Sequence, residues 1–233
     1  MMAELVIYNT VGFPDPETFI NFVHEACTYV DALELGIPPR FAKYDGPTIR
    51  RSYAIAAGAD YMNLIGKVRC RAVALTYLDG LDLEKFLDAA RNVEAVLFPD
   101  LLIDHLDRLE EVTKTVRDRS LKNVIFISPS VPDAIIKSAS RFADDFVYLG
   151  IRPATGVSTP VNVTGLVKRV RGMVDGKLIV GFGLKDDKEI AQAIDGGADG
   201  VAVGTSVMKV LEAQGEHEAI EKIKRLKEYV GSL

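Results

Sequence analysis

Two carboxylic acids, eleven positions apart, are the side chains best placed for acid–base chemistry. Glu34 lies inside the run DALELG (31–36), whose apolar residues predict a buried strand. Strand alternation places Leu33 and Leu35 on one face and Glu34 on the other. A carboxyl group buried in this way has a raised pKa, so it can hold or deliver a proton near neutral pH.

Asp45 lies in the loop after this strand, where two roles are open. It precedes Gly46-Pro47 and the segment TIRRSYAIA, which predicts a helix. An Asp just before a helix with Pro in its first turn is typical of an N-cap. Taken alone, the sequence position of Asp45 favours that role. Glu34 also has a structural alternative, as an acid paired with a lysine or arginine.

Short apolar runs recur along the whole chain and predict eight strands, at residues 4–10, 31–36, 71–77, 93–99, 123–128, 145–150, 177–183 and 199–204. Between them lie segments with helical spacing, such as 106–119, 161–174 and 217–230. Alternating strands and helices form parallel βαβ units, and eight units predict an α/β (βα)8 TIM barrel, a single domain over residues 1–233. An open doubly wound sheet usually has GxGxxG after its first strand, where this chain has NTVGFPDP.

In such a barrel the active site lies at the carboxyl ends of the strands, often with a phosphate bound after strands seven and eight. GFG (181–183) ends the seventh run, and GTS (204–206) ends the eighth and leads into a helical segment. Glycine lets the backbone approach a ligand, and a helix start offers free N–H groups to an anion. Tight turns alone explain either glycine cluster, but together they predict a phosphate site. We expect Thr155 and Gly156, in the long loop after the sixth run, to complete it as a lid.

The composition excludes several classes of protein. The net charge is −5 and both signs are spread along the chain, which argues against a nucleic-acid face or a polybasic membrane patch. No signal peptide or apolar run of ~18 residues is present, so we expect a cytoplasmic protein. Cys27 and Cys70 do not make a disulfide framework and lack metal-site spacing. His24, His105 and His217 fall in helical segments away from strand ends, so no metal site is expected.

The strand ends resemble those of the tryptophan synthase alpha chain family. LELGIP is followed by DGP, with the Asp eleven residues after the Glu. YNTVGFPDP is similar to the family's first-strand stretch, and the sixth strand with its lid, GFG and VGTSV follow in the family's order. The resemblance covers essentially the whole chain, although the family's usual helix before the first strand is missing or nearly so.

The resemblance implies a carbon–carbon lyase of tryptophan biosynthesis, which cleaves indole-3-glycerol phosphate to indole and glyceraldehyde 3-phosphate in a retro-aldol reaction. Glu34 matches the family's general acid/base, which protonates indole C3. Asp45 matches the carboxylate that accepts a hydrogen bond from indole N1–H and stabilises charge on the ring. The matching substrate-binding positions are Tyr77, Tyr148 and Phe182 in the pocket, Thr155 in the lid, and Gly156, Gly183, Gly204 and Thr205 around the phosphate.

The resemblance also implies a partner, because family members work in an α2β2 complex with a beta chain that binds pyridoxal phosphate. No cofactor is therefore expected on this chain. Pro39-Arg40-Phe41-Ala42 depart from the family's usual loop, and the lid is one residue shorter, which affects docking on the beta chain. The alternatives are another phosphate-binding TIM-barrel enzyme, which would need an acid cluster for magnesium, and a catalytically silent regulatory partner of the beta chain. The two intact acids argue against the silent partner.

Overall fold

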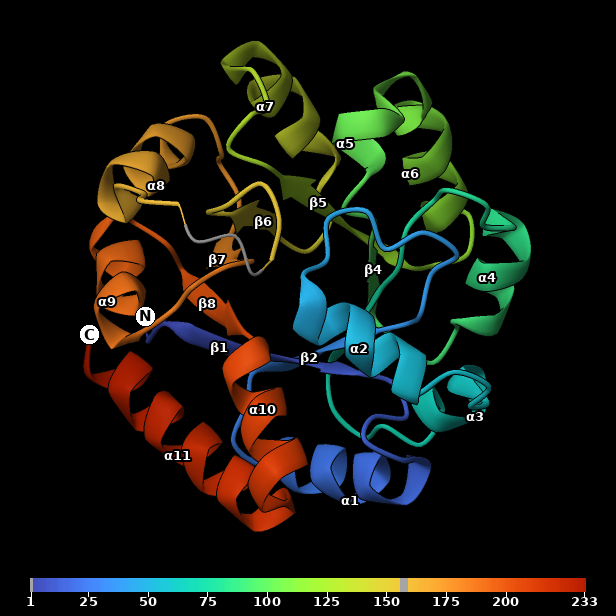
Figure 1. Ribbon diagram of the computed structural model, residues 1–233. Coiled ribbons are helices and arrows are strands. Elements are labelled where there is room, and N and C mark those ends of the chain that lie inside the picture. Colours follow the sequence, from blue (N-terminus) through green and yellow to red (C-terminus); the bar gives the residue numbers. More distant parts are fainter. Residues whose placement is uncertain (1, 156–158) are drawn as a thin grey trace.

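The computed structural model describes residues 2–155 and 159–233. Within them, eight parallel strands close into a barrel in sequence order, and the helices surround it (Figure 1). This confirms the predicted (βα)8 barrel. The strands are β1 (Glu4–Thr10), β2 (Ala32–Gly36), β3 (Ala72–Leu75), β4 (Ala95–Leu97), β5 (Lys122–Ile127), β6 (Val147–Gly150), β7 (Leu178–Gly181) and β8 (Gly200–Val203).

The helices fill the connections between strands and follow β8. They are α1 (Pro16–Ala26), α2 (Pro47–Ile55), α3 (Tyr61–Ile65), α4 (Leu83–Ala89), α5 (Leu101–Asp104), α6 (Leu109–Arg117), α7 (Asp133–Ala139), α8 (Val163–Arg171), α9 (Asp187–Asp195), α10 (Thr205–Gln214) and α11 (Glu216–Ser232), with 3-10 turns η1 (Leu106–Arg108) and η2 (Ser140–Phe142). The helix expected over 106–119 is therefore split between η1 and α6. No helix within the described residues has the length and apolar character needed to cross a membrane.

Local sequence explains where α1 begins and which face it buries. The Asp15 carboxylate accepts hydrogen bonds from the backbone N–H groups of Glu17 and Thr18, both at 3.0 Å, and so caps the first turn. The residues of α1 that are buried, at the helical spacing seen in the sequence, are Phe19, Phe22, Val23 and Ala26. This apolar stripe packs α1 against the barrel.

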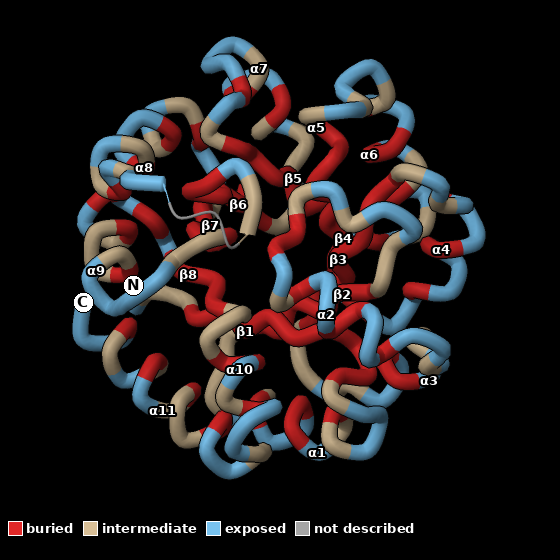
Figure 2. Tube along the Cα trace, in the orientation of Figure 1, coloured by how far each residue is buried: buried red, intermediate tan, exposed pale blue. Residues whose placement is uncertain are grey.

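Side-chain alternation along the strands divides the core into two layers. Leu33 and Leu35 pack between the sheet and the helices, whereas Tyr8 and Val73 pack inside the barrel. Glu34 is in register with Tyr8 of β1 and Val73 of β3. Glu34 therefore points into the barrel, as the alternation predicts. Figure 2 shows the strands and the inner faces of the helices buried and the outer faces exposed.

A disulfide joins Cys27, at the end of α1, to Cys70, just before β3, with the Cα atoms 5.5 Å apart. The expectation that the two cysteines form no disulfide framework is corrected to one disulfide. The pairing arises from the barrel, because a helix end and a strand start that are 43 residues apart in sequence meet at the amino-terminal end of the strands. The spacing of the two cysteines in the sequence does not by itself predict this pairing.

Removing this disulfide should destabilise the folded chain, because the crosslink restricts the unfolded state across a separation of 43 residues. We expect the double variant Cys27→Ala/Cys70→Ala to lose about 2 to 4 kcal/mol of unfolding free energy. Urea unfolding with and without a reductant measures the loss. The reductant should destabilise the wild type and leave the double variant unchanged, and equal midpoints for all four conditions would contradict the expectation.

Candidate active site

A cavity of about 290 Å³ opens at the carboxyl ends of the strands. It lies where the loops after β2, β6, β7 and β8 meet, which is the usual position of a TIM-barrel active site. The structure brings eight of the residues predicted for the site to this cavity: Glu34, Asp45, Tyr148, Thr155, Phe182, Gly183, Gly204 and Thr205. Gly156 lies outside the described residues.

Glu34 projects from β2 into this cavity and is only 3% exposed. Its Oε1 atom is buried and has no hydrogen-bond partner among the described residues. Burial, reinforced by the charge of Asp45, raises the pKa of the Glu34 carboxyl group to about 8. Within the described part of the chain no lysine or arginine pairs with Glu34, so the structural alternative of a buried ion pair is wrong.

Asp45 reaches the same cavity from the loop between β2 and α2 and is 6% exposed. The N-cap of α2 is Gly46, and no side chain caps the helix, so the reading of Asp45 as an N-cap is wrong. Burial raises the pKa of Asp45 to about 6, while the hydroxyl groups of Tyr77 and Tyr53 and the charge of Arg50 act in the opposite direction. Its Oδ2 atom has no hydrogen-bond partner within the described residues.

The two acids therefore release their protons in sequence. Asp45, with a pKa of about 6, ionises first, and Glu34, with a pKa of about 8, keeps its proton through neutral pH. Between these values the site holds one carboxylate and one carboxylic acid. Such a pair can stabilise a developing positive charge with one group while the other donates a proton.

The far side of the cavity is built from main chain. Gly183 follows β7 with a φ of 116°, and Gly204 is the N-cap of α10 without a side chain to cap it. A Cβ atom at Gly204 would lie 2.9 Å from the Cβ atom of Tyr8, so only glycine fits there. The N–H groups of Thr205 and Ser206, the first two residues of α10, have no partner within the helix, and such groups bind anions favourably. This geometry suits a phosphate group.

A buried arginine supports the Gly183 loop from behind. Arg152, which is 2% exposed, donates a hydrogen bond to the Gly183 carbonyl oxygen and forms an ion pair with Glu189 at 2.7 Å. Glu189 also accepts a hydrogen bond from the backbone N–H of Lys185 at 2.8 Å. The charge pair thereby fixes the main chain on both sides of Leu184, which itself borders the cavity.

Thr155 connects the loop after β6 to the Asp45 loop. The Gly46 N–H donates to Thr155 Oγ1 at 2.5 Å, and the Thr155 N–H donates to the Tyr44 carbonyl oxygen at 3.0 Å. The structure thus brings Thr155 against the Asp45 loop. Asp45 and Thr155, one from each loop, both border the cavity.

Aromatic side chains form one wall of the cavity. Phe126 lies behind Tyr148 and Phe182, with ring centroids 5.6 and 5.0 Å away. Tyr148 and Phe182 border the cavity, whereas Tyr77 is fully buried and is not among the described residues that line it. Tyr77 instead stacks on Tyr44, with centroids 6.1 Å apart, next to Asp45.

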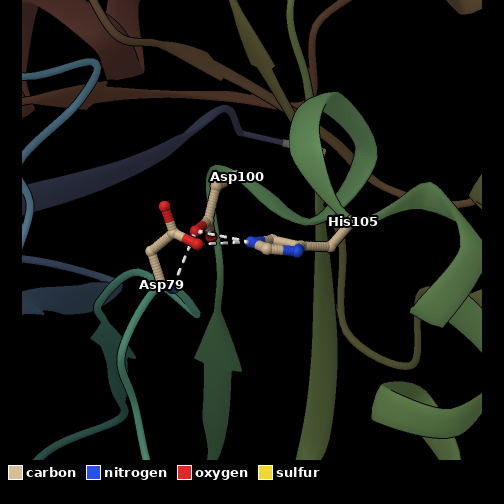
Figure 3. Close-up of side chains that lie close together, drawn as sticks. All are labelled: Asp79, Asp100 and His105. Carbon is tan, nitrogen blue, oxygen red and sulfur yellow. Dashed lines mark hydrogen bonds and ion pairs between the residues drawn. The ribbon is translucent and has the colours of Figure 1, made fainter.

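His105 lies close to strand-end carboxylates, which corrects the expectation that it is remote from them. Its Nε2 atom is 3.2 Å from Asp79 Oδ1 and 3.5 Å from Asp100 Oδ2, in the loops after β3 and β4 (Figure 3). The three ligand atoms lie within 4.8 Å of one another. The ammonium group of Lys43 already contacts Asp79, so the cluster is built as an ion-pair network. Asp79, Asp100 and His105 are not among the described residues that border the cavity.

The family model of the tryptophan synthase alpha chain matches residues 2–233. The chain belongs to this family. It is similar to the tryptophan synthase alpha chain of Saccharolobus solfataricus, with 46% identity over 96% of this chain and 95% of the relative. The corresponding figures for the Sulfurisphaera tokodaii protein are 41%, 97% and 97%. The alpha subunit in the solved tryptophan synthase a2b2 complex of Pyrococcus furiosus has a TM-score of 0.83 and 27% identity, with all of both chains covered.

The cavity of this tryptophan synthase alpha chain is also lined by residues that the sequence did not predict. The further residues that border the cavity include Tyr8, Ser206, Lys185 and Lys209. Lys209 lies one helical turn after Thr205 on α10, so helical spacing from the GTS segment could have found it. Lys185 lies two residues after GFG, so its closeness to that glycine segment in the sequence could have indicated it. Both lysines give the end of the cavity near Gly183 and Gly204 a positive charge.

Glu34→Gln should stabilise the folded chain at alkaline pH. The pKa of Glu34 in the folded chain is raised above its unfolded value, so its contribution to stability is complete at low pH and is lost as pH rises through about 8. A glutamine cannot ionise and escapes this loss. We expect Glu34→Gln to exceed the wild type in unfolding free energy at pH 9 by on the order of 4 kcal/mol, and to match it near pH 4.

Urea unfolding at the two pH values measures this difference. Glu110→Gln, at an exposed position of α6, is the matched control and should follow the wild type at both. A Glu34→Gln variant that gains nothing between pH 4 and pH 9 would show that the Glu34 carboxyl group is not held neutral by the fold.

Proposed function

We propose that this chain catalyses the retro-aldol cleavage of indole-3-glycerol phosphate to indole and glyceraldehyde 3-phosphate, in tryptophan biosynthesis. The observation that carries the proposal is the pair of buried acids with separated pKa values, about 8 for Glu34 and about 6 for Asp45, at one end of a cavity. The other end offers main-chain N–H groups and lysines to a phosphate. Membership of the tryptophan synthase alpha chain family supports the same reaction.

The reaction uses the two acids in different protonation states. Glu34 enters protonated and donates its proton to indole C3, which makes the ring an electron sink. Asp45 enters ionised, accepts a hydrogen bond from indole N1–H and stabilises the positive charge that develops on the ring. The Glu34 carboxylate then takes the proton of the glycerol hydroxyl group next to the breaking bond. The C–C bond electrons return to the indole ring, the hydroxyl carbon becomes the aldehyde, and Glu34 regains its proton.

The remaining site residues hold the substrate. We assign the phosphate to the main-chain N–H groups of Gly156, Gly183, Gly204 and Thr205, because helix starts and glycine loops bind anions with backbone donors. Tyr148 and Phe182 pack against the indole ring from the aromatic wall. The Tyr77 hydroxyl group favours the ionised form of Asp45, and Thr155 closes the lid against the Asp45 loop.

The proposal includes an assembly and a location. We propose that the chain works in an α2β2 complex with a tryptophan synthase beta chain that binds pyridoxal phosphate, and that it needs no cofactor itself. A solved relative forms an a2b2 complex. We also propose a cytoplasmic location and a single catalytic domain over residues 1–233. A disulfide is compatible with that location in hyperthermophilic archaea, whose intracellular proteins are rich in such bonds.

Purified protein should release indole from indole-3-glycerol phosphate, and faster with a cognate beta chain. Glu34→Gln should lower kcat by about 10² to 10⁴-fold while substrate still binds, because that is the usual contribution of general acid–base catalysis. Asp45→Asn should do nearly the same. Lys222→Gln, on α11, is the control and should keep full activity. No indole release with or without the beta chain would leave the silent partner as the better reading.

The pH profile of kcat/KM should be bell-shaped, because the reaction needs Asp45 ionised and Glu34 protonated. Activity should rise as Asp45 loses its proton near pH 6 and fall as Glu34 loses its proton near pH 8. The two apparent values belong to the coupled pair. Initial rates of indole release between pH 4.5 and 10 measure the profile. A rate that keeps rising beyond pH 9 would contradict the role of Glu34 as the initial proton donor.

A further inference from the structure

The Asp45 loop is held at several successive residues. Thr155 binds the main chain of Tyr44 and Gly46 on the lid side. On the opposite side, the Lys43 ammonium group contacts the carboxylates of Asp79 and, at 3.0 Å, Asp104. The loop is therefore attached to Thr155 on one side, and to the loop after β3 and the end of α5 on the other. Asp45 lies at the centre of this span.

Tyr44 reinforces the attachment made by Lys43. Its hydroxyl group is 2.9 Å from both carboxylate oxygens of Asp104 and donates to that carboxylate. Its ring stacks on Tyr77, whose hydroxyl group acts on the Asp45 carboxylate. Arg50 of α2 donates to the Lys43 carbonyl oxygen at 3.3 Å. The two residues before Asp45 thus have both side chain and main chain fixed.

Asp79, one of the two acids that Lys43 contacts, is itself held by other residues. Asp79 lies against His105 Nε2 at 3.2 Å, and its N–H donates to Asp100 Oδ2 at 3.2 Å (Figure 3). Asp100 is fully buried and accepts the Leu78 N–H with both oxygens, at 3.0 and 2.9 Å. Because this network holds Asp79 to the ends of β3 and β4, the contact with Lys43 attaches the Asp45 loop to a fixed point.

Stability does not account for these ion pairs. The side chains of Lys43 and Asp79 are 34% and 31% exposed, and pairs at that exposure contribute little to folding. Lys43 is also not among the described residues that border the cavity, so it does not touch the substrate. What the contacts restrict is the place of Asp45, whose Oδ2 atom has no other described partner to hold it.

We propose that Lys43 is a positioning residue, which ties the loop to Asp79 and Asp104 and thereby holds the Asp45 carboxylate against the reacting indole ring. The inference rests on the proposed role of Asp45. It concerns the segment where this chain departs from its family, because Lys43 directly follows Pro39–Ala42. A displaced catalytic group costs rate and not folding, since misplacement by about 1 Å can cost 10²-fold.

Lys43→Met keeps the aliphatic stem and removes the charge. We expect kcat for indole release to fall at least 10-fold, with KM changed less than threefold and the melting temperature unchanged. Lys43→Arg should restore most of kcat, because a guanidinium group can also bridge two carboxylates. Lys114→Met, at an exposed lysine on α6, is the control and should match the wild type. An unchanged kcat for Lys43→Met would overturn the inference.

A second cycle tests the route through the two acids. Asp79→Asn/Asp104→Asn should lower kcat as much as Lys43→Met, and adding Lys43→Met to that double variant should lower it no further, because all three act as one unit. Additive losses would show that Lys43 acts elsewhere and would overturn the inference.

Hydrogen exchange gives a readout that needs no substrate. The N–H groups of Gly46 and Thr155, bonded across the loop and lid, should exchange about 10-fold faster in Lys43→Met than in the wild type. Faster exchange in Lys43→Met, together with no indole release by the wild type, would refute the proposed reaction and leave the loop attachment standing. Unchanged exchange, or faster exchange with unchanged kcat, would overturn the positioning role.

Discussion

Glu34 places a carboxyl group inside the barrel, where the residue is only 3% exposed and its Oε1 atom has no hydrogen-bond partner among the described residues. Burial disfavours the charged form of this group and raises its pKa, so Glu34 keeps its proton through neutral pH. Because Glu34 is neutral at this pH, Asp45 can ionise nearby without a neighbouring negative charge. Tyr8 and Tyr148 surround the pair with apolar ring surface and limit further access of water. The chemistry of the site follows from this one unfavourable burial.

The rest of the site depends on loops that are rigid for different reasons. At the end of the cavity where we propose that the phosphate binds, the buried Arg152–Glu189 pair fixes the Gly183 main chain. At the end proposed for the indole ring, Thr155 and the network beyond Lys43 hold the Asp45 loop from two sides. The barrel supplies strand ends at fixed spacing, and these contacts set the separation between the Glu34 carboxyl group and the Gly204 main chain. Both ends must hold at once for a substrate to bridge them.

Local rules of sequence predicted the parts of the site that depend on periodicity. Strand alternation aimed Glu34 inward, and strand-end glycines marked Gly183 and Gly204. Asp45 illustrates the opposite case, because an Asp shortly before a helix is typical of an N-cap whether or not it lines a cavity. The choice depends on where α2 begins, and its N-cap is Gly46.

Contacts between distant segments left no comparable signal. The Lys43–Asp104 pair joins residues 61 positions apart, and the disulfide joins residues 43 apart. His105 meets Asp79 and Asp100 because two parallel strands end side by side. Periodicity within one element says nothing about such meetings. They depend on the closure of the barrel and on the path of each loop.

The Cys27–Cys70 bond also changes the connectivity of the molecule around the two acids. It closes residues 27–70 into a covalent ring that contains β2, α2 and α3. Glu34 and Asp45 both belong to this ring. A single peptide cleavage within it, in the exposed residues before α3 for instance, releases no fragment while the bond is intact. The second βα unit can therefore survive a nick that would divide an uncrosslinked chain into two pieces.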